Sequence, residues 1–164
     1  MTDSEKKSFY SVDANVFMDW QARFYPTDIF HSLLDKVDHL LKEERFFTPL
    51  LVREELDQVG TADLMKWTKG RPKLFIPLDE LISEAQKIQG QFPGLIDPKA
   101  EYEEADAYVI ALAKLHDGIV VSQETAASEK RNPKRTHYVP DVCRELGIHC
   151  INFLGLMRRE KWEF

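Results

Sequence analysis

The chain has 164 residues and a formal net charge of −6, with 43 % hydrophobic and 30 % charged residues. This size and composition suit one folded domain with its own core, and we expect residues 1–164 to form a single domain. The acidic balance argues against a protein that holds nucleic acid by overall positive charge. No apolar run is long enough for a signal peptide or a membrane span, which predicts a cytoplasmic protein with no membrane partner.

Short apolar runs predict strands, and apolar residues spaced three and four apart predict helices. In chain order we expect strand 9–13, helix 15–23, helix 27–41, strand 45–48, helix 49–60, helix 61–69, extended segment 74–77, helix 79–92, helix 103–116, strand 119–121, helix 140–147, strand 149–153 and helix 154–162. Thr27 is expected to cap its helix. Strands that alternate with helices predict an α/β domain with a mainly parallel sheet.

Several common sites are not found in the sequence. It contains no glycine-rich phosphate loop, which argues against P-loop and dinucleotide-binding proteins. Cys143 and Cys150 are the only cysteines and do not form a C-x-x-C pair, so a structural zinc site is not expected. Two small core thiols in a reducing compartment are the simplest interpretation, and a disulfide between them is the alternative.

Four acidic residues stand where predicted elements begin or end: Asp13, Glu55, Asp106 and Glu124. Carboxylates at the carboxyl ends of parallel strands converge on one crevice. Like charges in one crevice repel unless a hard cation lies among them, and Mg²⁺ or Mn²⁺ prefers oxygen ligands. The four residues therefore predict a centre for one or two metal ions, suited to phosphoryl chemistry.

Asn15 and Ser122 accompany these acids. Asn15 can orient Asp13 or contact a substrate phosphate, and the Ser122 hydroxyl can hold a carboxylate or a water. Structural roles compete at the same positions. Asp13 and Asn15 suit a helix N-cap, and Asp106 in a first helical turn interacts favourably with the helix dipole by about 0.5 kcal/mol.

Other acids lie close to these positions. Glu54 is a rival to Glu55 on the same helix, and the sequence leaves that choice open. Glu103 and Glu104 are interpreted as ordinary acids of a first helical turn, and Asp141 is interpreted in the same way.

Basic residues form three groups, and a solvated surface is the simplest interpretation of each. The first group is Lys66, Lys69, Arg71 and Lys73, and the last is Arg158, Arg159 and Lys161. The middle group follows soon after Glu124 in an irregular, polar stretch, so it offers the best candidates for contact with RNA phosphates. These candidates are Lys130, Arg131, Lys134 and Arg135.

Taken together, the motifs resemble the PIN-domain nucleases in order and spacing. The segments that carry the likeness are Asp13-x-Asn15, Val52-x-x-Glu55-Leu56, Ala105-Asp106-Ala107 and Ser122-x-Glu124. The segment Val139-Pro140-Asp141-Val142-Cys143 is similar to a bacterial branch of PIN-like proteins with no assigned function. The likeness covers nearly the whole chain. It departs from the family at Glu124, where Asp is commoner, and at Ser122, where Thr is commoner.

The resemblance implies a three-layer α/β/α sandwich with a central, mainly parallel sheet. It also implies Mg²⁺- or Mn²⁺-dependent cleavage of RNA that leaves a 5′-phosphate and a 3′-hydroxyl. In that hypothesis Asp13 and Asp106 bind the metal directly, while Glu55 and Glu124 complete its shell. A further implication is a toxin of the VapC type, restrained by a partner antitoxin.

Alternatives remain open at this stage. The protein can be a non-catalytic PIN-like module that binds RNA or another protein and uses its acids as a structural charge cluster. It can also cleave DNA, although no extended basic stretch suits a long duplex. A homodimer is a further possibility, with contacts through Phe24, Tyr25, Trp67 or Trp162, although core packing is the commoner fate of such residues.

Overall fold

The computed structural model describes residues 7–97, 99 and 104–164. Its centre is a five-stranded parallel sheet with strand order β3-β2-β1-β4-β5. The strands are β1 (Tyr10–Val12), β2 (Phe46–Pro49), β3 (Phe75–Ile76), β4 (Ile119–Val121) and β5 (Cys150–Ile151). Ser11 in the central strand pairs with Phe47 on one side and with Val120 on the other. The prediction of a parallel α/β sheet is therefore confirmed.

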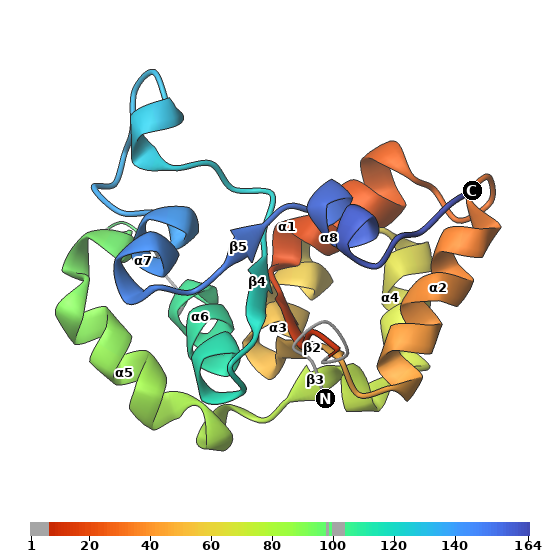
Figure 1. Ribbon diagram of the computed structural model, residues 1–164, viewed down its shortest axis with the longest axis horizontal. Helices are drawn as coiled ribbons and strands as arrows, with labels where there is room; N and C mark the ends of the chain where they lie inside the picture. The colour runs from red at the N-terminus through yellow and green to blue at the C-terminus, as the bar shows by residue number, and fades with distance from the viewer. Residues whose placement is uncertain (1–6, 98, 100–103) are drawn as a thin grey trace.

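Helices cover both faces of this sheet. They are α1 (Ala14–Phe17), the π-helical η2 (Met18–Phe24), α2 (His31–Lys42), α3 (Leu50–Val59), α4 (Ala62–Lys69), α5 (Ile82–Gln91), α6 (Asp106–Leu115), α7 (Val139–Leu146) and α8 (Phe153–Arg159). Short 3₁₀ turns are η3 (Pro72–Leu74), η4 (Leu78–Glu80), η5 (Pro93–Leu95) and η6 (Ala127–Glu129). Figure 1 shows α5, α6 and α7 on one side of the strands and α1, α2, α4 and α8 on the other, which confirms the three-layer α/β/α sandwich.

The central helix α6 explains how the core positions one edge of the sheet. Every residue from Ala107 to Ala113 is buried, because α6 packs against the sheet as well as α5 and α7. Its alanines let the backbone approach closely, and the Ser11 hydroxyl donates to the Val109 carbonyl over 2.6 Å. The first residue of α6, Asp106, is thereby held at the carboxyl edge of the strands.

The segment after β1 differs from the expected pair of helices in two ways. The first helix continues as η2, and the Tyr25 N–H closes it on the Trp20 carbonyl over 2.9 Å. The expectation that Thr27 caps the next helix is wrong, since α2 begins at His31. The reason is a turn in which the Pro26 carbonyl accepts the N–H groups of the residues at positions 29 and 30.

The aromatic residues offered as dimer contacts separate into two kinds. Trp67 is only 7 % exposed and packs against Trp20, with ring centroids 5.1 Å apart, so it belongs to the core and is not available as a dimer contact. Phe24 is 59 % exposed, whereas Tyr25 and Trp162 are partly buried.

Candidate functional site

A cleft of about 530 Å³ opens where the strands end, at the edge of the sheet from which the β4–α7 segment projects (Figure 1). Six of its described lining residues are acidic: Asp13, Glu55, Asp97, Glu104, Asp106 and Glu124. All four predicted site acids are among these six. The remaining described lining residues are Ala14, Asn15, Lys99 and Arg135. The cleft is therefore strongly acidic on balance.

Three of the acids form a tight group. Asp13, Asp106 and Glu124 each place one carboxylate oxygen within 4.8 Å of the others. They come from the end of β1, the start of α6 and the loop after β4, so only the tertiary fold brings them together. Oxygens that share a Mg²⁺ ion at about 2.1 Å lie at most about 4.2 Å apart, so small side-chain rotations suffice for a common cation.

Asp13 is fixed in place by three hydrogen bonds. Its Oδ1 accepts the Ala14 N–H over 2.8 Å and caps α1. Its Oδ2 accepts the Ser122 hydroxyl over 2.9 Å and the Asn15 amide over 3.4 Å. Ser122 Oγ in turn accepts the Glu124 N–H over 3.1 Å. Asp13 thus serves both as the predicted helix cap and as a member of the acidic group.

Asn15 braces the site from the other side. Its Oδ1 accepts the Gln123 N–H over 3.0 Å, which ties α1 to the loop after β4. The Gln123 side chain donates to Asp19 over 3.2 Å and accepts the Phe153 N–H over 2.8 Å. Gln123 and Asp19 were not predicted, since nothing in their local sequence marks residues that meet only in the folded chain.

Glu55 lies in the cleft but outside the three-carboxylate group. Its Oε1 accepts the Ala105 N–H over 3.2 Å and so caps α6, whose own N-cap residue has no side-chain acceptor. Burial, above all, raises the pKa of Glu55, and the charge of Glu104 adds to this effect. Glu54 is exposed, so the structure places Glu55 and not its neighbour at the site.

The electrostatics of the three-carboxylate group show an excess of negative charge. Burial and the charge of Glu124 raise the pKa of Asp13, although the Ser122 hydrogen bond opposes them. Burial and the charge of Asp13 raise the pKa of Asp106 against the opposing charge of Arg135. Burial and Asp106 raise the pKa of Glu124 to about 7. Carboxylates that resist ionisation together are those that a bound cation would relieve most.

Arg135 is the one predicted RNA-contacting residue that lines this cleft. Its Nη1 donates to Asp106 Oδ2 over 3.1 Å and to the Leu95 carbonyl over 3.2 Å. Its Nη2 lies 3.0 Å from Glu104 Oε2 and 4.0 Å from Asp97 Oδ2. The expectation that Arg135 faces solvent with the other loop cations is thus wrong, because these carboxylates draw its guanidinium inward.

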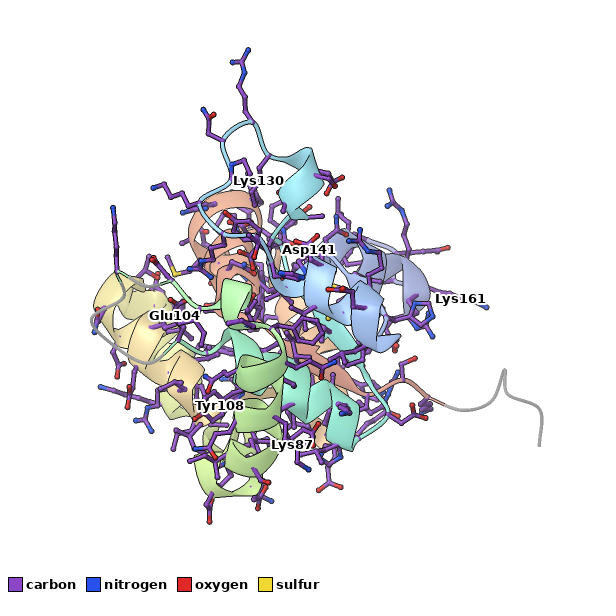
Figure 2. The ribbon with its side chains drawn as sticks, turned by 90° about the vertical axis from the view of Figure 1, so that its left-hand side faces the viewer. Lys87, Glu104, Tyr108, Lys130, Asp141 and Lys161 are labelled. Carbon is purple, nitrogen blue, oxygen red and sulfur yellow. The ribbon has the colours of Figure 1, made fainter. Side chains whose placement is uncertain are left out.

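The other three candidates for RNA contact lie on the segment between β4 and α7, residues 122–138, which we call the projecting segment. Arg131 and Lys134 are exposed, and Lys130 donates to Thr125 Oγ1 over 2.8 Å. Lys130 also lies 4.3 Å from the ring centroid of Tyr138. In the view of Figure 2, Lys130 lies above Glu104.

Two acids of the cleft were missed or misinterpreted. Glu104 was assigned to an ordinary first helical turn, yet it binds Arg135 and accepts the Asp97 N–H over 3.2 Å. Glu103, given the same interpretation, lies outside the described residues. Asp97 has no local signal, since it stands in an irregular stretch. The position of Glu104, two residues before Asp106, was the one sequence feature that could have identified it.

Asp141 is buried away from the cleft lining and has a structural role. Its Oδ2 accepts the Ala127 and Tyr138 N–H groups, each over 2.9 Å. It therefore fastens both ends of the projecting segment to the start of α7, in addition to the expected first-turn position.

The fold and the cleft define an α/β/α protein with an acidic site at the carboxyl edge of a parallel sheet. A family model described as a domain of unknown function (DUF4411) matches residues 10–164, so the chain belongs to that family. Comparisons with curated proteins and with solved structures gave no match. No helix in the described part of the chain has the length and apolar character needed to cross a membrane.

Proposed function

We propose that this protein is a metal-dependent endoribonuclease of the PIN type, which hydrolyses RNA phosphodiester bonds. The observation that carries the proposal is the convergence of Asp13, Asp106 and Glu124, with oxygens within 4.8 Å of one another. Their raised pKa values support it, because the group holds more negative charge than its surroundings solvate.

The donor set fits Mg²⁺ or Mn²⁺. The described lining residues offer carboxylate and amide oxygens and include neither Cys nor His, which argues against zinc. Asp13, Asp106 and Glu124 would hold the ion, and Glu55 would complete its shell through water. Bound there, the ion would supply hydroxide near neutral pH and offset phosphate charge.

The chain's own residues would orient the reacting groups. Ser122 fixes the direction of the Asp13 carboxylate by donating to it, and Asn15 keeps α1 registered on the β4 loop. The exposed cations at positions 131 and 134 lie in the same segment as Arg135, which lines the cleft, and there they would bind the RNA backbone. A sugar–phosphate chain crossing from that segment to the acids would place one phosphate over the three-carboxylate group.

A second candidate is the non-catalytic PIN-like module that binds RNA or a protein. The observation that favours it is Arg135, which offsets part of the charge of Asp106 and Glu104 without any metal. A cluster stabilised in this way can be structural. Divalent metal that binds and raises the unfolding temperature would favour the enzyme.

The cytoplasmic location, an antitoxin partner and a homodimer belong to the same proposal. The antitoxin partner is supported by the resemblance to PIN toxins, a weaker basis than the site. The location is supported by the lack of a long apolar run, and the homodimer by the exposed Phe24. Induced expression in a bacterial host should arrest growth with wild type and not with Asp13→Ala. Normal growth with active wild-type nuclease would remove the toxin role and leave the nuclease itself.

The deciding experiment is cleavage of RNA, single-stranded DNA and duplex DNA with Mn²⁺, with Mg²⁺ and with EDTA. Asp13→Ala and Asp106→Ala are compared with Glu54→Ala, which removes an exposed acid beside the site. Circular dichroism must first show that each variant is folded. Metal-dependent RNA cleavage lost only in the two site variants supports the proposal. No RNA cleavage by wild type with either metal overturns it, and cleavage of DNA alone reassigns the substrate.

A further inference from the structure

Among the described residues, two cations line the acidic cleft, Lys99 and Arg135, and Arg135 lies among its carboxylates. Arg135 contacts Asp106 at 3.1 Å and Glu104 at 3.0 Å, and its side chain is 19 % exposed. A guanidinium keeps its charge at every pH at which the protein is folded. The carboxylates of Glu104, Asp106 and Glu124 raise its pKa further, in opposition to burial, which lowers it.

The position of this guanidinium is determined by the surrounding fold. The Tyr138 hydroxyl accepts the backbone N–H groups of Lys134 and Arg135 over 3.0 and 3.3 Å. The Tyr138 ring centroid lies 5.8 Å from Arg135 Cζ. The backbone N–H of Tyr138 donates to the buried Asp141. These contacts hold the backbone at Arg135, and the guanidinium itself is held by Asp106, Glu104 and the Leu95 carbonyl.

Arg135 lies next to the three-carboxylate group. Asp13, Asp106 and Glu124 place oxygens within reach of a common ion. The guanidinium already binds Asp106 Oδ2 and Glu104. Two ions in a phosphoryl-transfer site lie roughly 3.5–4 Å apart and share a carboxylate between them. Asp106 belongs to the three-carboxylate group, and its Oδ2 already accepts a hydrogen bond from Arg135.

We propose that Arg135 is the resident second cation of this cleft, so that the site takes one divalent ion and not two. This inference rests on the proposed function, because it assumes that the three-carboxylate group binds an ion. Its basis is charge and geometry together. A second dication beside a fixed guanidinium would meet strong repulsion at close range and would find its ligands already hydrogen-bonded.

The test is the stoichiometry of Mn²⁺ binding, measured by calorimetric titration and by electron paramagnetic resonance of free Mn²⁺. Wild type is compared with Arg135→Met, Arg135→Lys and the control Arg158→Met, which removes an exposed arginine on α8. We expect one ion in wild type, Arg135→Lys and Arg158→Met. We expect Arg135→Met to bind a second ion. We also expect it to bind the first ion at least about tenfold more tightly than wild type does, because a nearby positive charge is gone.

The outcomes separate this inference from the proposed function. Two ions in wild type, or one ion with unchanged affinity in Arg135→Met, overturn the role of Arg135 while leaving a metal-dependent nuclease intact. No Mn²⁺ binding by any variant overturns both. Thermal unfolding must show that Arg135→Met is folded, and Arg135→Gln replaces it otherwise. If wild type binds two Mn²⁺ ions, that result alone overturns the inference, whatever the variants do.

Discussion

The two edges of the sheet hold similar charged groups in opposite electrostatic balance. At the amino edge, Arg45 pairs with Glu43 at 3.0 Å and with Glu160 at 2.6 Å, and the Tyr10 hydroxyl also donates to Glu160 over 2.5 Å. Hydrogen bonds from Lys7 and then Arg45 lower the pKa of Glu43. At the carboxyl edge the acids outnumber the cations, and their pKa values are raised.

Burial is the largest cause of the raised pKa values at the carboxyl edge, but the two edges also differ in how their charges are paired. The side chains of Arg45 and Glu160 are 11 % and 14 % exposed, while those of Arg135 and Asp106 are 19 % and 18 % exposed. The amino edge meets its acids with enough donors and is a structural clamp. The carboxyl edge leaves its acids only partly balanced, and buried carboxylates with raised pKa values indicate a candidate functional site.

The largest expected effect is on activity at the carboxyl edge. Asp106→Asn should lower metal-dependent RNA cleavage at least about a thousandfold, because several kcal/mol of charge stabilisation depends on the bound ion. The rate is measured on a labelled RNA with Mn²⁺ in excess. Asp57→Asn, an exposed position on α3, is the control and should cleave as wild type does. Undiminished cleavage by Asp106→Asn would contradict the assignment of this residue.

Breaking the amino-edge clamp should instead reduce stability. Arg45→Met leaves the largely buried Glu160 without its arginine partner, and such a loss costs about 3 kcal/mol of unfolding free energy. Urea denaturation measures the change. Excess Mn²⁺ should not restore the unfolding free energy of Arg45→Met. It should restore the unfolding free energy of Arg135→Met, because the ion replaces the lost positive charge. Recovery of both variants by Mn²⁺ would remove the distinction between the two edges.

Metal should stabilise the carboxyl edge specifically. Mn²⁺ at 100 times its dissociation constant should raise the unfolding free energy of wild type by about 2.7 kcal/mol. Asp13→Asn should lose most of this gain, because one of the three nearest ligands is gone. Thermal denaturation with and without Mn²⁺ checks the expectation. An equal gain in wild type and Asp13→Asn would place the ion elsewhere.

The raised pKa values give the metal-free protein an unusual pH dependence. An ordinary carboxyl titrates near pH 4 in the unfolded chain, but Glu124 titrates at about 7 in the fold, and Asp13 and Asp106 are raised as well. Between these values the folded state binds more protons than the unfolded state. Stability in EDTA should therefore rise as the pH falls from 8 toward 5.

Two controls sharpen the pH experiment. Asp13→Asn should show a flatter rise, since one buried acid no longer titrates. Saturating Mn²⁺ should reverse the slope in wild type, because protons then compete with the ion for the same oxygens. Chemical denaturation at each pH measures both slopes. If the stability of wild type in EDTA decreases as the pH is lowered from 8 toward 5, other carboxyls dominate the pH dependence.

The smallest expected effect concerns the projecting segment. Tyr138→Phe removes the acceptor of the Lys134 and Arg135 N–H groups and should cost about 1 kcal/mol of stability. Hydrogen exchange at these two amides should accelerate more than exchange in β1. Uniform acceleration across the chain would mean that Tyr138 supports the whole fold and not this segment.

Local sequence determined the architecture and part of the site. Apolar runs and helical periodicity specified the parallel α/β order, because side-chain spacing depends only on neighbouring residues. Asp13 and Glu124 follow two strands that are neighbours in the sheet, and parallel strands end at the same edge. Their proximity, and that of Asp106 at the start of α6, therefore followed from the order of elements.

Only the tertiary structure decided the direction of side chains on irregular segments. Glu104, Asp97 and Arg135 meet because Tyr138 and a buried acid at position 141 fasten a loop that has no periodic pattern. Glu55 was distinguished from its neighbour by the Ala105 N–H, a contact 50 positions away in sequence. Contacts of this kind depend on three-dimensional packing that residue spacing does not encode, so the sequence determined where the acids gather, and the fold decided how their charge is balanced.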